Sequence, residues 1–380
     1  MAASTRLSVR FAAVALLLAA SVATPFVADW LTGLFLGSVP RYALLTPETS
    51  VRYKTVEFDI IAHANRFGFR GDESTIRTGQ IVAIGDSYTF GWGNNLGDTW
   101  EKVLARKLAE NGKPTEVYNL GRPGADPQDY LDIAKTYIPL LKPRLIIVAL
   151  LQGDDIAQLI ERGMRVPVPS IVDRVKDLAW EHIPNLVALA RSTGAMLAAT
   201  PLATANWGAD AAHIIAEQKL QLDDELRALA LAGSVNPGGL QLVATDPNRM
   251  PDAYSARPQA VTARRQVVDI LRAISALASA YGSHVMLLSM PSGNYFNSAS
   301  LQMARRMGFV LPDSLIGSPE PDAFTAAACR EIGIDCLGYS DLFRAQGSRA
   351  TLWYPVDGHL TADGNRLLGD ALARDLTPQL

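Results

Sequence analysis

The sequence lacks the residue patterns that mark a metal or nucleotide site. Its 380 residues include only two cysteines and five histidines, and these are not spaced as metal ligands usually are. No glycine-rich stretch matches the Walker or dinucleotide-binding patterns. A net charge of −3 gives no strong attraction to a nucleic acid or to an anionic membrane surface. We therefore expect no metal, no organic cofactor and no nucleic-acid partner.

Internal repeats and low-complexity tracts are also missing, and 48% of the residues are hydrophobic. A chain of this length and composition can bury a large core. The two cysteines, Cys329 and Cys336, leave two alternatives open. They form a small-loop disulfide in an oxidising compartment or stay as two buried thiols, and the geometry of the fold decides between them.

Charge is absent from residues 11–28, which follow Arg6 and Arg10. A positive region before an apolar run is typical of a secretory signal peptide, and residues 21–23 resemble its cleavage site. At about 18 residues, the run is also long enough for an uncleaved signal anchor. Both interpretations predict export to the periplasm or another extracytoplasmic space, with residues 1–40 as a signal peptide or an inner-membrane anchor. The alternative is a buried N-terminal helix of a cytosolic domain.

An apolar run at residues 81–84 ends abruptly in Gly85, Asp86 and Ser87. Such a run predicts a buried parallel strand, with Ser87 at its carboxyl end, where open α/β sheets bind their ligands. Further apolar runs alternate with helical patterns downstream, which predicts an α/β fold with a central parallel sheet of five strands. The predicted strands are residues 81–84, 116–120, 144–151, 284–290 and 334–337.

Two segments stand outside this alternation. Residues 41–80 are predicted to be a lead-in, in which residues 51–60 form an edge strand or a hairpin arm. Within it, residues 65–71 either fold over the sheet near the active face or form a tight turn packed by two phenylalanines. Residues 156–258 have proline-rich turns and helical stretches, and we expect a helical lid or flanking subdomain inserted between the third and fourth strands. The alternative is two crossover helices with long surface loops. Residues 81–380 then form the main domain.

A serine at a strand end becomes a nucleophile only if a base is delivered to it. His359 is the candidate base, because it precedes the last predicted helix and follows Asp357 by two residues. Asp357 can hold one imidazole nitrogen while the other takes the Ser87 proton, and such general-base delivery contributes roughly 10²–10⁴-fold in rate. Acyl transfer also needs hydrogen-bond donors for the developing oxyanion, and the backbone N–H groups of Ser87 and Gly124 are candidates.

Together these residues resemble the SGNH/GDSL hydrolases, a superfamily of esterases, lipases and acyl-transfer enzymes. Ser87 matches the nucleophile of the Gly-Asp-Ser motif, and Gly124 matches the glycine that supplies an oxyanion N–H. Asp357 and His359 match the family's C-terminal triad residues. The resemblance implies a flavodoxin-like three-layer α/β/α fold with a Ser-His-Asp triad.

The resemblance covers roughly residues 81–154 and 284–375, and the oxyanion hole departs from it. In the family's third motif, an asparagine side chain donates to the oxyanion, but here Asp154 stands in its place after Gly153. An ionised carboxylate is only an acceptor. Either burial keeps Asp154 protonated, or Asp155 or another donor compensates, or the site is weakened. The C-terminal motif also departs, because it has one residue between aspartate and histidine instead of two, as in some exported members that act on polysaccharides.

These features predict an exported serine esterase that hydrolyses a short acyl ester, with acetyl favoured, on an envelope or extracellular carbohydrate. The expected partner is thus a small-molecule or glycan ester. One alternative is a carbohydrate O-acyltransferase that uses the same triad, which is favoured if residues 156–258 exclude water. A second alternative, suggested by Asp154, is a weakened or non-catalytic homologue that binds glycan or scaffolds an envelope assembly.

Overall fold

The computed structural model describes residues 23–34, 44–164, 175, 178–179, 182–187, 189–190, 203–204, 207–346 and 352–380. The chain divides into two compact units, one of residues 1–43 with 167–199 and the other of residues 44–166 with 200–380. The division expected from the sequence, into residues 1–40, 41–80 and 81–380, stays a prediction.

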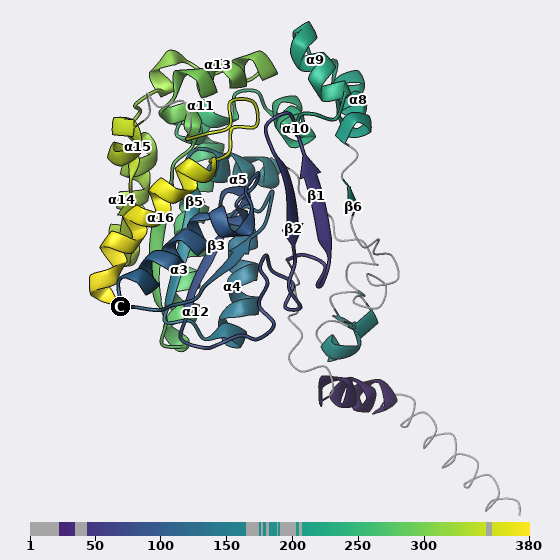
Figure 1. Ribbon diagram of the computed structural model, residues 1–380, viewed down its shortest axis with the longest axis vertical. Coiled ribbons are helices and arrows are strands. Elements are labelled where there is room, and N and C mark those ends of the chain that lie inside the picture. The colour runs from purple at the N-terminus through teal and green to yellow at the C-terminus, as the bar shows by residue number, and fades with distance from the viewer. Residues whose placement is uncertain are drawn as a thin grey trace, which may run out of the picture. The chain divides into compact units, whose positions relative to one another are not determined.

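A parallel sheet of five strands forms the centre of the larger unit, in the order β4-β3-β5-β7-β8 (Figure 1). Counted along the chain, this is the order second, first, third, fourth, fifth, which defines the flavodoxin-like fold. The predicted fold class is therefore confirmed. The strands are β3 (Ile81–Gly85), β4 (Val117–Gly121), β5 (Leu145–Leu151), β7 (His284–Met290) and β8 (Asp335–Gly338).

The sheet buries both faces because successive side chains of its strands point to opposite sides. In β3, Val82 and Ile84 join the core under α4 and α12, whereas Ile81 and Ala83 join the core under α3 and α16. These two cores make the three layers of the fold, with α4, α12 and α14 on one face of the sheet and α3 and α16 on the other (Figure 1). The flanking helices are α3 (Trp100–Glu110), α4 (Pro127–Leu141), α12 (Pro258–Ala280), α14 (Glu320–Ile332) and α16 (Ala362–Leu376).

The connection between β5 and β7 is a helical insertion, as predicted. Three of its helices pack around a small core of their own, to which Met307 also belongs. Residues 167–199 of the insertion belong to the smaller unit, and the helical lid or flanking subdomain expected for residues 156–258 stays a prediction. Outside residues 165–202, which the structure describes only in part, the helices of the connection before α12 are α5 (Asp154–Met164), α8 (Trp207–Gln218), α9 (Asp224–Leu231), α10 (Pro237–Thr245) and α11 (Arg249–Ala253). Three further helices in the unit are α2 (Ser87–Phe90), α13 (Ser298–Met307) and α15 (Ser340–Gln346).

The lead-in contains a hairpin of β1 (Ser50–Lys54) and β2 (Asp59–His63). It belongs to a separate three-stranded sheet, in which β1 also pairs with β6 (Ala203–Thr204) of the insertion. The hairpin alternative is thus confirmed, and it does not extend the main sheet. In the turn of residues 65–71, Phe67 and Phe69 stack with ring centres 6.2 Å apart.

Cys329 of α14 and Cys336 of β8 form a disulfide, with their Cα atoms 6.0 Å apart. Of the two alternatives for these cysteines, a disulfide or two buried thiols, the structure has the disulfide. The turn from α14 into β8 brings the two side chains together.

In the smaller unit, residues 23–34 form a helix whose Asp29 accepts hydrogen bonds from Asn185 and from the Leu186 N–H. None of the helices in the described ranges combines the length and the apolar character needed to span a bilayer. The predicted signal or anchor segment, residues 11–28, lies largely outside the described residues.

Candidate active site

Ser87 is the first residue of α2, a helix of a single turn that follows β3 directly. The Asp86 side chain caps this helix by accepting a hydrogen bond of 2.9 Å from the Tyr88 N–H. Because β3 lies between β4 and β5, the loops that follow those two strands flank Ser87. These loops carry Gly124 and Asp154.

The structure brings Ser87, Asp357 and His359 together, although His359 lies 272 residues after Ser87. His359 Nε2 is 2.7 Å from Ser87 Oγ. On the other side of the ring, His359 Nδ1 is 2.5 Å from Asp357 Oδ1. The imidazole therefore has a hydroxyl at one nitrogen and a carboxylate at the other, which is the geometry that activates a serine nucleophile.

Neighbouring charges control the protonation of His359. Burial lowers its pKa, but the charge of Asp357 and its hydrogen bond outweigh burial, so the pKa is raised above the ordinary value of 6.5. The charges of Asp86 and Asp154 add to this rise. Burial in turn raises the pKa of Asp86 to about 7, and the Asp154 charge reinforces that shift. Asp154 therefore acts electrostatically on the site.

The backbone N–H groups predicted to bind the oxyanion are available. Within the described part of the chain, neither the Ser87 N–H nor the Gly124 N–H donates a hydrogen bond. Gly124 has a φ of 73°, which a residue with a Cβ rarely adopts, so glycine is required at this position of the loop. Both donors remain predictions, and they lie on neighbouring strand ends as an oxyanion hole requires.

Asp154 has a buried positive neighbour that the sequence did not indicate. Arg249 of α11 is 1% exposed and places Nη2 3.0 Å from Asp154 Oδ1. The same guanidinium donates through Nη1 to Glu161 Oε1 at 2.7 Å. The charge at position 154 is thus balanced from the insertion. Asp155 lies in the core instead, where its carboxylate accepts hydrogen bonds from the Tyr130 hydroxyl and the Leu151 N–H.

Two other residues that contact Asp357 were missed by the sequence reasoning. The indole Nε1 of Trp92 donates to Asp357 Oδ2 at 3.3 Å. Trp92 is a buried packing residue with 7% exposure, but its indole N–H faces the site. Glu57 of the lead-in accepts a hydrogen bond from the Asp357 N–H. No motif surrounds Glu57, so the sequence offers no signal for it.

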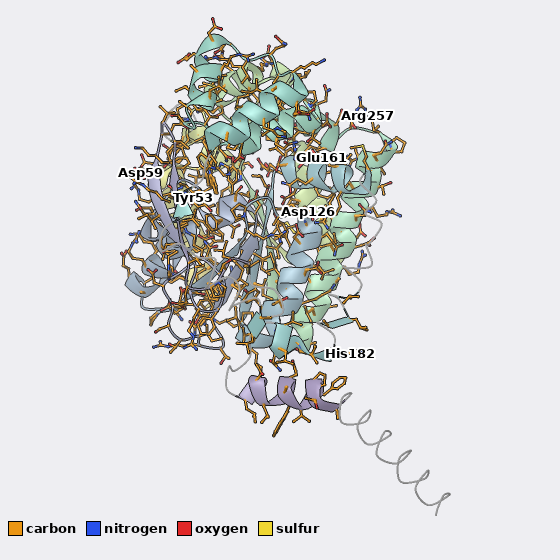
Figure 2. The ribbon with its side chains drawn as sticks, turned by 90° about the vertical axis from the view of Figure 1, so that its right-hand side faces the viewer. Tyr53, Asp59, Asp126, Glu161, His182 and Arg257 are labelled. Atoms are coloured by element: carbon orange, nitrogen blue, oxygen red, sulfur yellow. A yellow bond between two sulfur atoms is a disulfide. The ribbon has the colours of Figure 1, made fainter. Side chains whose placement is uncertain are left out.

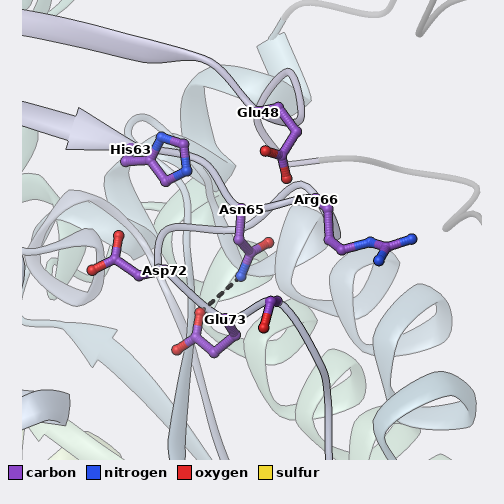
Figure 3. A pocket seen from close by; sticks show the side chains of 7 residues that line it. Glu48, His63, Asn65, Arg66, Asp72 and Glu73 are labelled. Atoms are coloured by element: carbon purple, nitrogen blue, oxygen red, sulfur yellow. Dashed lines mark hydrogen bonds between the residues drawn. The ribbon is translucent and has the colours of Figure 1, made fainter.

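A polar pocket of about 530 Å³ lies elsewhere in the larger unit (Figure 3). Its lining includes neither Ser87 nor His359, and within it Asn65 donates a hydrogen bond to Glu73. No group of three or more His, Cys, Asp or Glu side chains among the described residues is placed to hold a metal ion. The pocket lining is Glu48, His63, Asn65, Arg66, Asp72, Glu73 and Ser74.

Comparison with protein families gives a match to the GDSL-like lipase/acylhydrolase family over residues 83–304. This range is more than half of the chain; it includes Ser87, Gly124 and Asp154 and ends before Asp357 and His359. A search of curated proteins gave no significant match.

Several solved structures are similar to this chain at low identity. A lipase/acylhydrolase from Enterococcus faecalis is 13% identical, with 80% of this chain and 97% of that chain covered and a TM-score of 0.42. TesA is 14% identical, with coverages of 79% and 99% and a TM-score of 0.40. The acetyl xylan esterase AlAXEase is 11% identical, with coverages of 78% and 99% and a TM-score of 0.38.

Proposed function

Because the chain belongs to the GDSL-like lipase/acylhydrolase family, whose members are esterases and lipases, we propose that it is an esterase with Ser87 as nucleophile. The observation that carries the proposal is the position of His359, with Nε2 2.7 Å from Ser87 Oγ and Nδ1 2.5 Å from Asp357 Oδ1. A serine hydroxyl, a base and a carboxylate in this arrangement are the nucleophile, the general base and the orienting group that acyl transfer requires.

In this proposal, Ser87 Oγ attacks the ester carbonyl carbon while its proton passes to His359 Nε2. Asp357 holds the Nδ1 proton and stabilises the imidazolium. The carbonyl oxygen becomes negative and is bound by the N–H groups of Ser87 and Gly124. The intermediate then expels the alcohol, which takes the proton from Nε2, and the acyl group stays on Oγ. Water repeats the sequence, which releases the acid and restores Ser87.

We propose that the substrate is a short acyl ester, with acetyl favoured, on an envelope or extracellular carbohydrate. The proposal is supported by the single residue between Asp357 and His359, the shorter spacing that resembles some exported members acting on polysaccharides. Transfer of the acyl group to a carbohydrate hydroxyl would use the same triad. The two reactions differ only in whether water or a sugar hydroxyl attacks the acyl-enzyme.

Export, and an anchor or signal function for residues 1–40, are also proposed. The Cys329–Cys336 disulfide supports export, because disulfides persist mainly in oxidising compartments. The helix of residues 23–34 exposes Phe26, Trp30 and Leu34 by 48%, 63% and 63%, and their spacing of four places them on one face, as for an apolar surface against lipid. Alkaline extraction of membranes from cells that produce the full chain tests anchoring; release of the protein into the soluble fraction would contradict it.

Covalent labelling tests the proposed function directly. A fluorophosphonate probe is expected to label the full chain at Ser87, as located by mass spectrometry, because only an activated serine attacks the phosphorus. Ser279→Ala, which removes an exposed serine of α12, should label like the wild type. In the same preparation, p-nitrophenyl acetate is expected to be hydrolysed faster than the decanoate ester. Absence of labelling at Ser87 in folded protein would favour a non-catalytic glycan-binding homologue.

The Asp154→Asn substitution is expected to move the acidic limb of the pH profile of kcat/KM to lower pH. His359 must be neutral to act as a base, so the rate falls as the pH drops through its raised pKa. The Asp154 charge is one cause of that rise, and its removal lowers the pKa. Profiles measured with p-nitrophenyl acetate show the shift. Asp363→Asn, which removes a carboxylate paired with Arg366 in the first turn of α16, is the control, and an unmoved limb in Asp154→Asn contradicts the prediction.

A further inference from the structure

The loop that carries Asp357 is held by a carboxylate from outside the family's matched range. Glu57, in the turn between β1 and β2, accepts hydrogen bonds from two consecutive backbone N–H groups. Its Oε1 binds the Val356 N–H at 2.8 Å, and its Oε2 binds the Asp357 N–H at 2.7 Å. Two charge-assisted bonds to neighbouring peptide groups restrict the rotation of the backbone at Asp357.

The helix that carries Ser87 is held from the same segment. Arg70 is 1% exposed, and its guanidinium donates to the carbonyl oxygens of Phe90 at 2.5 Å and Gly91 at 2.8 Å. A third bond reaches the Asn94 carbonyl oxygen at 2.5 Å. The last carbonyl groups of a helix lack partners within the helix, and a cation there satisfies them.

This support matters because α2 has only four residues. A helix of one turn has no stability of its own, so its geometry depends on its caps. Asp86 caps the N-terminal end and Arg70 binds the C-terminal end. The close approach also explains Gly91, since a Cβ there would lie 2.4 Å from Thr99 Cγ2 and 3.2 Å from Arg70 Nη1.

The hairpin that carries Glu57 in its turn also packs against the site. The Tyr53 ring of β1 lies 4.7 Å from the Trp92 ring, measured between ring centres, and Trp92 donates to Asp357 Oδ2. Tyr53 and Asp59 mark the two strands of this hairpin in Figure 2. One segment, residues 53–70, therefore contacts the loops of two triad residues that are far apart in the sequence.

We propose that Glu57 and Arg70 are positioning residues of the proposed active site, and that the lead-in segment holds the Ser87 helix and the Asp357 loop in register. This inference rests on the proposed function of Ser87. The contact of 2.7 Å between Ser87 Oγ and His359 Nε2 joins helix α2 to the loop that carries Asp357 and His359, and no shared helix or strand connects these two segments. The Tyr88 hydroxyl donates directly to the Gly358 carbonyl oxygen at 2.8 Å. The two lead-in side chains add a second connection, with an anion at backbone N–H groups and a cation at backbone carbonyl groups.

Glu57→Ala is expected to lower kcat for p-nitrophenyl acetate by roughly 10–100-fold with little change in KM, because a misplacement of about 1 Å costs up to about 10²-fold in rate. Glu57→Gln keeps one acceptor oxygen for one of the two N–H groups, so kcat should recover in part. Asp59→Ala, which removes an exposed carboxylate from the same hairpin, is the control and should leave kcat unchanged.

A spectroscopic measurement separates positioning from general stability. The proton between His359 Nδ1 and Asp357 Oδ1 is in a short hydrogen bond of 2.5 Å and should give a strongly downfield proton NMR signal. We expect this signal to move upfield in folded Glu57→Ala and to keep its position in Asp59→Ala. A signal that stays in place in Glu57→Ala would overturn the inference. This measurement needs no substrate, whereas equal turnover by wild type and Ser87→Ala would count against the proposed function alone.

Arg70→Lys tests the other contact without removing a buried charge. Lysine is a point charge and lacks the planar fork that reaches three carbonyl groups. We expect kcat to fall by at least about 10-fold, in the range given for misplaced groups. Arg66→Lys changes an exposed arginine in the same turn and is the control. Equal kcat values for the two variants would overturn the role of Arg70.

Discussion

Replacing Ser87 by alanine is expected to lower kcat for p-nitrophenyl acetate by roughly 10³–10⁶-fold, since a triad whose nucleophile is missing retains only binding and oxyanion stabilisation. The hydroxyl lies 2.7 Å from His359 Nε2, so its loss leaves the base without its proton donor. Steady-state kinetics with active-site titration of the wild type measure the effect.

The double variant Ser87→Ala with His359→Ala gives the sharper result. Ser87 and His359 act as one unit, so the rate lost by removing both is not the product of the two separate losses. The double variant should therefore be about as slow as Ser87→Ala alone. Further loss in the double variant would mean that His359 activates water without Ser87. His284→Ala, at an exposed histidine that begins β7, is the control for the loss of an imidazole and should keep wild-type kcat.

Arg249→Met is expected to lower the free energy of unfolding by about 3–5 kcal/mol, the usual cost of breaking a buried ion pair by removing one partner. The guanidinium is 1% exposed and lies within ion-pair distance of Asp154 and Glu161, whose side chains are 17% and 11% exposed. Methionine fills much of the same volume but leaves two carboxylates without their shared cation. Urea unfolding at constant pH measures the change from the shift in midpoint.

The partners of Arg249 provide the test of this explanation. Combining Arg249→Met with Asp154→Asn and Glu161→Gln neutralises the carboxylates, and much of the lost stability should return. Arg306→Met is the matched control, because Arg306 also pairs with two carboxylates, those of Asp223 and Glu225, but at the surface. Its effect should stay within about 1 kcal/mol. Equal losses in Arg249→Met and Arg306→Met would contradict the prediction.

The elements of the fold were predictable because their patterns are local. Short, mainly apolar runs identified the strands, and the run at residues 284–290 coincides with β7 (His284–Met290). The start of α4 is also encoded locally, because Asp126 caps the helix by accepting hydrogen bonds from two backbone N–H groups and Pro127 stands at its first position. The length of residues 156–258 predicted an inserted helical segment, because a connection of that length is expected to contain structure of its own.

By itself, the sequence determined the strands, the insertion and the three triad candidates, because apolar periodicity and motif residues can be recognised without knowing which segments meet. Only the tertiary structure decided which residues surround those candidates. It joined Cys329 to Cys336, placed Arg249 against Asp154, and brought Glu57 and Arg70 to the Asp357 and Ser87 loops. A buried charge or a hydrogen bond between distant loops depends on the three-dimensional path of the chain, and no local pattern around these residues records it.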